Sequence, residues 1–322
     1  MKPQRRVFTV TMLALALPAR AQAPARIAWI SSIGAADEAA NLEAFHAGMR
    51  EQGLQDARHY VVDTSYADGK YERFPAMTAE LIKRDPALIV VRTIASVRAA
   101  QQATKSIPIL FITTNDPVGN GLVASLARPG GNTTGLSSQL EDFITKQVEF
   151  MREVLPRATR AAVLINPRNP SGKQLFGRVQ AAATGVGITA FAFEAETPER
   201  LDAAFAAIAK FRPDALLMIG DAMLGEQRAR ISAFALKQRI PHFGTGPRYV
   251  ESGSFMAYGL SLPPYYRRAA IYAKKLLAGV KPADLPVEQP TIFEMAVNLK
   301  TAKALGITVP YSILLRTDKV IE

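Results

Sequence analysis

The amino-acid sequence predicts an α/β protein of two lobes, each built on a parallel sheet covered by helices. Three observations lead to this fold class. Short apolar runs alternate with amphipathic helical segments along most of the chain. The alternation restarts after residue 137, so two β/α series of similar length follow one another. The last quarter departs from this pattern and contains a proline-rich connection, 281–290, which is long enough to pass between lobes.

The first β/α series is predicted between residues 26 and 138. Its strands are short apolar runs, and its helices carry apolar residues on one side. The predicted strands cover 26–30, 59–64, 87–91 and 109–112, and the predicted helices cover 37–51, 71–84 and 95–104. A further helix over 117–126 is predicted because Asp116 and Pro117 have the pattern of a helix cap followed by a proline in the first turn.

The second series repeats the alternation, and the remainder of the chain is more irregular. The predicted strands cover 161–165, 188–193, 215–219, 241–243 and 255–258, and helices are expected over 140–154, up to 184, over 198–210 and over 225–239. A helix over 263–277, a strand over 293–298, a short helix over 299–305 and a charged tail complete the chain. This order implies three crossings between lobes, near residues 137, 260 and 290, which restrict relative motion to a hinge.

The stretch 111–139 joins the two series and places polar residues at two strand tips. Thr113, Thr114 and Asn115 follow the strand over 109–112, and Ser137 and Ser138 end the next extended piece. Ligands of open α/β sheets bind outside the carboxyl ends of the strands. We therefore expect a ligand cleft between the lobes here.

Composition excludes several kinds of site. The 322 residues include no cysteine, so disulfides, thiol catalysis, a cysteine-based metal site and a lipid anchor on an N-terminal cysteine are excluded. The histidines, His46, His59 and His242, do not have metal-ligand spacing. Hydrolase, zinc-protease and phosphate-loop motifs are absent, and Gly185-Val186-Gly187 ends a helix rather than opening one. We therefore expect neither a cofactor nor catalysis.

The amino terminus has the pattern of a secretory signal peptide. Lys2, Arg5 and Arg6 precede an apolar run, and a small-residue pattern ends at Ala23, after which cleavage is expected. Residues 1–23 also match a twin-arginine signal in part. Cleavage would leave an exported protein, periplasmic in a bacterium with two membranes, without a lipid anchor.

The basic excess does not indicate nucleic acid. The formal net charge is +11, and removal of residues 1–23, which carry four basic and no acidic residues, leaves +7. The basic residues are spread along the helices close to acids or apolar faces, and they do not alternate with aromatic residues. We interpret them as a solvated surface.

Four segments carry a resemblance to a known family. They read QATKSIPILF (102–111), DPVGNGLVASLARPGGNTTGLS (116–137), YVESGSFMAYG (249–259) and YRRAAIYAKKLLAGVKPADLPVEQPTIFEMAVNLKTAKALG (266–306). In this order they resemble the ABC transporter substrate-binding proteins of the group with tryptophan- and tyrosine-binding members. The resemblance runs from residue 26 to 322 and implies the type I periplasmic-binding fold, with two Rossmann-like lobes joined by a three-crossover hinge.

The resemblance also implies a function and a division of the chain. The first lobe would comprise 24–137 with 260–289, and the second 138–259 with 290–322. Such a protein, expected to be a monomer, closes on a small solute and presents it to an ABC permease in the membrane. A ligand-sensing partner of a membrane receptor is the alternative, and an enzyme is the rival class.

Residues that match the family's pocket positions are the expected ligand contacts. The resemblance places them after the strands of both lobes: Ser31, Ser32, Ile33, Thr93, Ile94, Thr113, Thr114, Asn115, Ser137, Ser138, Asn166, Asp221, Gly244 and Tyr258. The hydroxyls and helix-start N–H groups suit a carboxylate, and Asp221 suits an ammonium, so an amino acid would satisfy both. The chain departs from the family by having Arg92 before Thr93. If Arg92 points inward, a dicarboxylate or an aromatic acid is favoured instead.

Overall fold

The computed structural model describes residues 23–289 and 291–322. The predicted signal peptide, apart from residue 23, and residue 290 therefore lie outside the described part. Within that part, none of the helices combines the length and the hydropathy that a membrane span requires.

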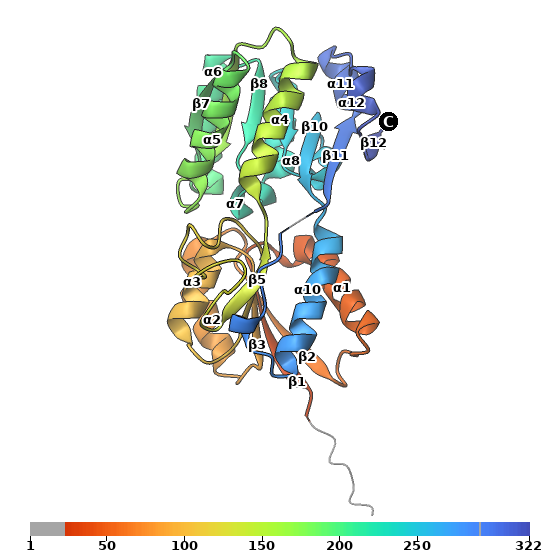
Figure 1. The fold of residues 1–322 in the computed structure, drawn as a ribbon. Coiled ribbons are helices and arrows are strands. Elements are labelled where there is room, and N and C mark those ends of the chain that lie inside the picture. The colour runs from red at the N-terminus through yellow and green to blue at the C-terminus, as the bar shows by residue number, and fades with distance from the viewer. Residues whose placement is uncertain (1–22, 290) are drawn as a thin grey trace, which may run out of the picture.

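The first sheet has five parallel strands in the order β2-β1-β3-β4-β5. Helices α1, α2, α3 and α10 accompany it, and we call this assembly the first lobe (Figure 1). Its strands are β1 (Ala25–Ser31), β2 (Tyr60–Tyr66), β3 (Leu88–Val91), β4 (Ile109–Thr114) and β5 (Thr133–Ser137). Its helices are α1 (Ala35–Glu51), α2 (Phe74–Ile82), α3 (Ile94–Ala103) and α10 (Leu262–Leu277), with the short turns η1 (Tyr71–Arg73) and η3 (Pro282–Asp284).

The second sheet has seven strands in the order β12-β11-β10-β9-β8-β6-β7, and we call it with its helices the second lobe. Its pairs are parallel except β10 with β11. Its strands are β6 (Arg160–Ile165), β7 (Thr189–Glu194), β8 (Ala215–Met218), β9 (His242–Gly244), β10 (Met256–Leu260), β11 (Phe293–Asn298) and β12 (Lys319–Ile321). Its helices are α4 (Leu140–Val154), α5 (Gly172–Gly185), α6 (Leu201–Phe211), α7 (Ala222–Glu226), α8 (Arg228–Lys237), α9 (Pro247–Glu251), α11 (Leu299–Leu305) and α12 (Tyr311–Leu314), with the turn η2 (Pro198–Arg200).

The two parallel-dominated sheets confirm the predicted fold class. Chain order shows three passages between the lobes: after β5, between β10 and α10, and before β11 (Figure 1). At the first and third passages the backbones pair with each other, because the N–H of Ser137 donates to the carbonyl of Glu288 at 2.8 Å. The lobes are thus joined by neighbouring segments rather than by one flexible tether.

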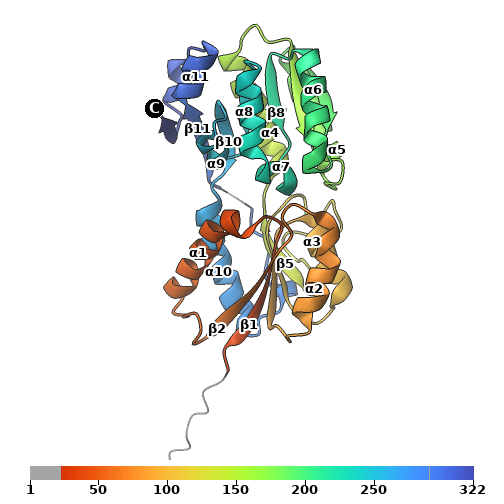
Figure 2. The ribbon, with the colours of Figure 1, turned by 180° about the vertical axis from the view of Figure 1, so that it is seen from behind.

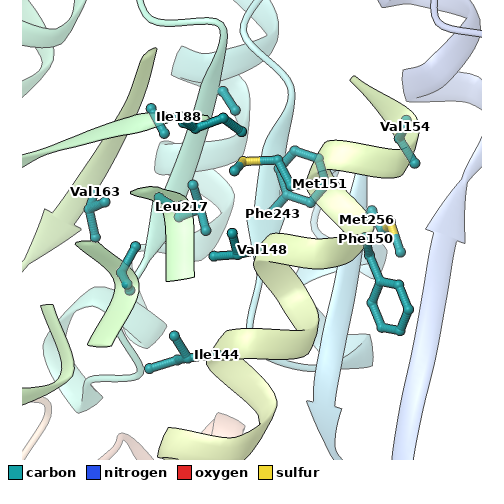
Figure 3. Packing of buried hydrophobic residues seen from close by; sticks show 14 of the residues in the cluster. Ile144, Val148, Phe150, Met151, Val154, Val163, Ile188, Leu217, Phe243 and Met256 are labelled. Atoms are coloured by element: carbon teal, nitrogen blue, oxygen red, sulfur yellow. The ribbon is translucent and has the colours of Figure 1, made fainter. Parts of the chain in front are cut away.

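Apolar side chains of α4 form part of the core of the second lobe. Val148 and Met151 are fully buried and face strand residues such as Leu217 and Phe243 (Figure 3). The hydrophobic residues of α4 recur at helical spacing, so one side of the helix covers the sheet. This packing fixes the start of α4, which lies directly after the first passage.

Helix α10 returns to the first lobe and packs closely against α1 (Figure 2). Gly48 of α1 allows the approach, because an added Cβ would lie 2.4 Å from the carbonyl oxygen of Arg267 and 2.8 Å from the Cβ of Ala270. Trp29 of β1 stacks on Tyr266 of α10, with ring centroids 5.8 Å apart. Through these contacts the late segment of the chain belongs to the core of the first lobe.

The predicted helix over 117–126 is wrong. The structure has a series of turns there, in which the N–H of Gly121 donates to Val118 and that of Leu122 to Pro117. Asp116 does accept a bond from the N–H of Gly119 at 2.8 Å, as a cap would. However, Gly121, in the middle of the predicted helix, has φ of +66°, and a left-handed residue there stops a right-handed helix. Strand β12, in the charged tail, was not predicted.

We predict that Gly48→Ala destabilises the protein, although alanine is the better helix former by about 1 kcal/mol. Its Cβ would force α1 and α10 apart, at a cost of about 1–3 kcal/mol. Urea unfolding measures the free energy of unfolding. The matched control is Gly177→Ala on α5, where an added Cβ meets nothing within 4 Å, so that this variant should gain stability. Equal gains in both variants would contradict the close helix contact.

Candidate functional site

A cavity of about 500 Å³ lies between the two lobes, within the size range of small-molecule sites. The carboxyl ends of the strands point toward it in both sheets, except for β11 and β12, which run the opposite way and begin near it. The sequence-predicted residues that line it are Ser32, Ile33, Arg92, Thr93, Ile94, Thr113, Thr114, Asn115, Ser138 and Asp221. The structure thus brings together residues that are up to 189 positions apart in the sequence, counted from Ser32 to Asp221.

The tip of β4 positions Arg92 in the wall of the cavity. Thr113 has φ of +61°, which is a strained conformation for a β-branched residue. Its hydroxyl accepts a bond from Nε of Arg92 at 3.2 Å, and the hydroxyl of Thr114 donates to the carbonyl of Arg92 at 2.8 Å. Thr93 acts as the cap of α3, since its hydroxyl accepts from the N–H of Ser96 at 3.2 Å. Strand β4 therefore holds both the side chain and the main chain of Arg92.

Beneath Arg92 lies a buried carboxylate. Glu38 of α1 accepts bonds from the indole of Trp29 at 3.1 Å and from the hydroxyl of Ser31 at 3.0 Å. Burial raises the pKa of Glu38, although the nearby charge of Arg92 acts in the opposite direction. Burial would lower the pKa of Arg92, but Tyr266 and Glu38 outweigh it, so that its pKa is raised and it stays charged.

Asp221 forms the cap of α7 and also connects the lobes. Its carboxylate accepts bonds from the N–H of Leu224 at 3.0 Å and from the amide of Asn166 at 3.1 Å. The phenol of Tyr71, from the first lobe, donates to it at 2.6 Å. Burial raises the pKa of Asp221, while these bonds act to lower it. Most of its acceptor capacity is therefore used by the protein itself.

One carboxylate of the first lobe binds two arginines of the second lobe, and we call this cluster the Asp37 bridge. Arg228 donates to both oxygens of Asp37, at 2.7 and 2.6 Å. Arg248 donates to Oδ1 of Asp37 at 2.5 Å and to its carbonyl at 2.9 Å. Burial would raise the pKa of Asp37, but the hydrogen bond and charge of Arg228 and the charge of Arg248 keep it below 3.8.

Further contacts show how closely the lobes approach. Glu226 of α7 accepts from the N–H of Gly34 at 2.7 Å, and Arg168 pairs with Glu72 at 3.2 Å. Gly69, with φ of +74°, would place a Cβ 2.7 Å from the Cα of Met223. The described lobes are thus closed over the cavity.

Three serine hydroxyls in the cavity wall are left without a hydrogen-bond partner among the described residues. They belong to Ser32, Ser138 and Ser171, each at most 2% exposed. Ser32 follows β1 of the first lobe, and Ser138 follows β5 at the first passage between the lobes. Ser171 lies at the start of α5 in the second lobe. Buried polar groups are nearly always bonded. Orphaned hydroxyls around a cavity indicate the places where a bound molecule supplies the missing partners.

Apolar side chains form the rest of the wall. Because apolar side chains line the cavity together with the polar strand tips, the cavity is amphipathic. They include Ile33, Ile94, Leu140, Phe143, Pro170, Leu260, Leu262 and Pro263.

Five sequence-predicted residues lie outside the cavity wall. Ser31 bonds to Glu38, and Ser137 pairs with Glu288 at the hinge. Asn166 holds Asp221. An added Cβ on Gly244 would lie 2.3 Å from the Cβ of Tyr249. Glycine at this position therefore allows the Tyr249 side chain to pack against the strand. Tyr258 packs between Phe150 and Phe293.

Sequence reasoning missed several residues of the cavity. Asp37, Tyr71, Ser171, Arg228, Arg248 and Tyr249 were not named, although all line it. They lie at or near helix starts rather than at strand ends, and the signal for Asp37, Tyr71, Arg228 and Arg248 is the partner they meet in the other lobe. The described residues include no group of three histidine or acidic side chains placed to hold a metal ion.

Comparisons with known proteins agree with this arrangement. A tyrosine-binding protein of Clostridioides difficile is 25% identical over 261 residues, which cover 81% of this chain and 75% of that protein. The crystal structure of a conserved domain protein from Vibrio cholerae O1 biovar El Tor is 26% identical, with a TM-score of 0.85 over 92% of this chain and 99% of that one. An ABC domain from Streptococcus pneumoniae in complex with L-Trp is 22% identical, with a TM-score of 0.86 over 92% of this chain and 100% of that one.

The match to a family model covers nearly the whole described chain. The model, described as ABC transporter substrate binding protein, matches residues 27–321. The chain therefore belongs to the family of ABC transporter substrate-binding proteins.

Proposed function

We propose that this protein captures a small carboxylate-bearing solute between its lobes outside the cytoplasm and delivers it to an ABC permease. The observation that carries the proposal is the set of orphaned hydroxyls of Ser32, Ser138 and Ser171 around a closed cavity between the lobes. Arg92, Thr113 and the N–H groups at nearby helix starts would complete the contacts to a carboxylate.

Two named relatives support an amino acid as one class of solute to test. One is a tyrosine-binding protein, and one was solved in complex with L-Trp. The amphipathic cavity is compatible with a solute that has one charged and one apolar end. The binding residues we propose are the ten predicted ones in the wall, together with Tyr71, Ser171 and Tyr249.

The remaining parts of the proposal concern the setting of the protein. It would be exported by the signal peptide over residues 1–23, act in the periplasm without a lipid anchor and work as a monomer without catalysing a reaction. Delivery to a permease rests on the family to which the chain belongs. Sensing for a membrane receptor would use the same closure. Genes for a permease and an ATPase beside this one would favour transport.

We predict that Ser138→Ala weakens solute binding without destabilising the free protein. The hydroxyl has no partner among the described residues, so its loss should cost the free protein nothing, while the bound solute loses one hydrogen bond of about 1 kcal/mol. A thermal-shift screen of amino acids, aromatic acids and dicarboxylates first identifies a solute that raises the melting temperature. Titration calorimetry then measures the affinity, expected to fall about fivefold.

The matched control for this test lies far from the cavity wall. Thr78 of α2 also has a buried hydroxyl without a partner in the described chain, but it does not line the cavity. Thr78→Val should therefore leave solute affinity unchanged. Equal affinity in Ser138→Ala and wild type would remove the orphaned hydroxyls as support for a solute site.

We also predict that Asp37→Asn makes closure less favourable and lowers solute affinity about tenfold, or roughly 1.4 kcal/mol. The neutral amide keeps the shape but loses the charge that attracts Arg228 and Arg248. Calorimetry measures the affinity, and small-angle X-ray scattering measures the radius of gyration with and without solute. Glu80→Gln, which breaks an exposed ion pair with Lys83 on α2, is the control and should change neither quantity.

The pH dependence of this effect follows from the lowered pKa of Asp37. A carboxylate with a lowered pKa contributes to the closed state above its ordinary value of 3.8, and the contribution is lost as the pH falls through the lowered pKa. The affinity difference between wild type and Asp37→Asn should therefore be full at pH 7 and shrink below about pH 4. A difference that is constant down to pH 3 would contradict a role for the charge.

A further inference from the structure

We propose that the cleft selects carboxylic acids that have an apolar body and no α-ammonium group, and that Arg92 sets this preference. The inference rests on the proposed function and concerns the chemical class of the solute. It departs from what the two amino-acid-binding relatives would indicate, and it follows from the charges of this chain's own cavity.

The first step is the state of the Arg92 side chain. Arg92 lines the cavity, and its guanidinium is fixed by the bond from Nε to Thr113. Tyr266 is a further hydrogen-bond partner, and the buried Glu38 acts on Arg92 through its charge, while the ion pairs of the neighbouring cavity arginines go to Asp37. A guanidinium has five donors in a planar fork that fits a carboxylate. Arg92 stays charged through Tyr266 and Glu38, so its guanidinium offers donors to the carboxylate of a bound solute.

The second step is the balance of charge around the cavity. The Asp37 bridge joins two guanidinium groups to one carboxylate, so it carries a net positive charge. Two further carboxylates, Glu38 behind Arg92 and Glu226 beside the bridge, offset part of this charge but do not line the cavity, whereas Arg92 and the bridge do. The side of the cavity formed by Arg92 and the bridge therefore attracts an anion and repels a cation.

The third step is that the carboxylates of Asp37 and Asp221 are already engaged by the protein. An ammonium group has three donors that need acceptors once water is excluded. Asp221 accepts from Leu224, Asn166 and Tyr71, and both oxygens of Asp37 are taken by arginines. Two other carboxylates line the cavity, Glu251 of α9, which is paired with Lys319, and Glu294 of β11.

These steps give a consistent picture of the bound solute. Its carboxylate pairs with Arg92 and accepts from the hydroxyls of Ser32 and Ser138. Its apolar body lies against side chains such as Ile94 and Phe143. An α-ammonium on the same carbon skeleton would be placed beside positive charges, and the carboxylates of Asp37 and Asp221, which could offset its charge, are already engaged.

The test compares each aromatic amino acid with the acid that lacks only its amino group. The pairs are L-phenylalanine with 3-phenylpropionate, L-tyrosine with 3-(4-hydroxyphenyl)propionate and L-tryptophan with indole-3-propionate. Calorimetry on the full mature protein measures each affinity. We expect the acid to bind at least tenfold more tightly in each pair that shows binding. An amino acid that binds as tightly as its acid would overturn the inference.

Absence of binding by every member of the three pairs would also overturn it, without removing the proposed function. Capture of a solute is tested separately by the broader thermal-shift screen, in which any solute that raises the melting temperature supports it. The two failures are thus distinguishable.

The role of Arg92 has its own readout. In Arg92→Gln the affinity for the acid should fall about 100-fold, and the preference for the acid over the amino acid should disappear. Arg92→Lys should recover part of the preference, because it keeps the charge and loses the fork. The control is Arg178→Gln on α5, which removes a guanidinium from an exposed position outside the cavity wall and should change neither affinity nor preference. A preference that survives in Arg92→Gln would show that another group sets it.

Discussion

The Asp37 bridge is the contact on which the closed arrangement of the two lobes depends. A single carboxylate, 18% exposed, accepts bonds from arginines on two different helices of the second lobe. Partly buried pairs of this kind are screened much less than surface pairs. With this contact in place, Tyr71 reaches Asp221, Glu226 reaches Gly34 and the strand tips of both sheets enclose one cavity.

Most of the order of strands and helices could be predicted from the sequence, apart from the short helices α9 and α12, because a parallel sheet buried on both faces leaves continuous apolar runs. The helix over 117–126 was wrong for a local reason. Asp116 bonds to the N–H of Gly119 as a cap would, and a cap signal does not show whether the backbone beyond it stays right-handed. Strand β12 could not be predicted, since a charged segment of three residues becomes a strand only through pairing with β11.

The candidate site was predictable in its position but less so in its detail. The resemblance to the family pointed to Ser32, Ile33, Arg92, Thr93, Ile94 and Asp221, and the rule that ligands lie at the carboxyl ends of strands located Thr113, Thr114, Asn115 and Ser138. It did not distinguish Ser31 from Ser32, because neighbouring residues at a strand end face opposite sides, and Ser31 turns toward Glu38. It also could not find Asp37, Arg228 and Arg248. These residues contact one another between the lobes, across more than 190 positions of sequence.

Closure and solute binding are linked by the groups that the closed cavity leaves unpaired. Bringing the lobes together gains the Asp37 bridge and the bond from Tyr71 to Asp221. It also removes water from three serine hydroxyls and confines the guanidinium of Arg92, which costs free energy as long as the cavity holds no partner for them. A solute that supplies these partners binds the closed state better than the open one, and only such a difference in affinity can shift the equilibrium. The three serine hydroxyls and the guanidinium of Arg92 therefore make closure of the lobes depend on the solute, because the protein alone does not supply all their partners.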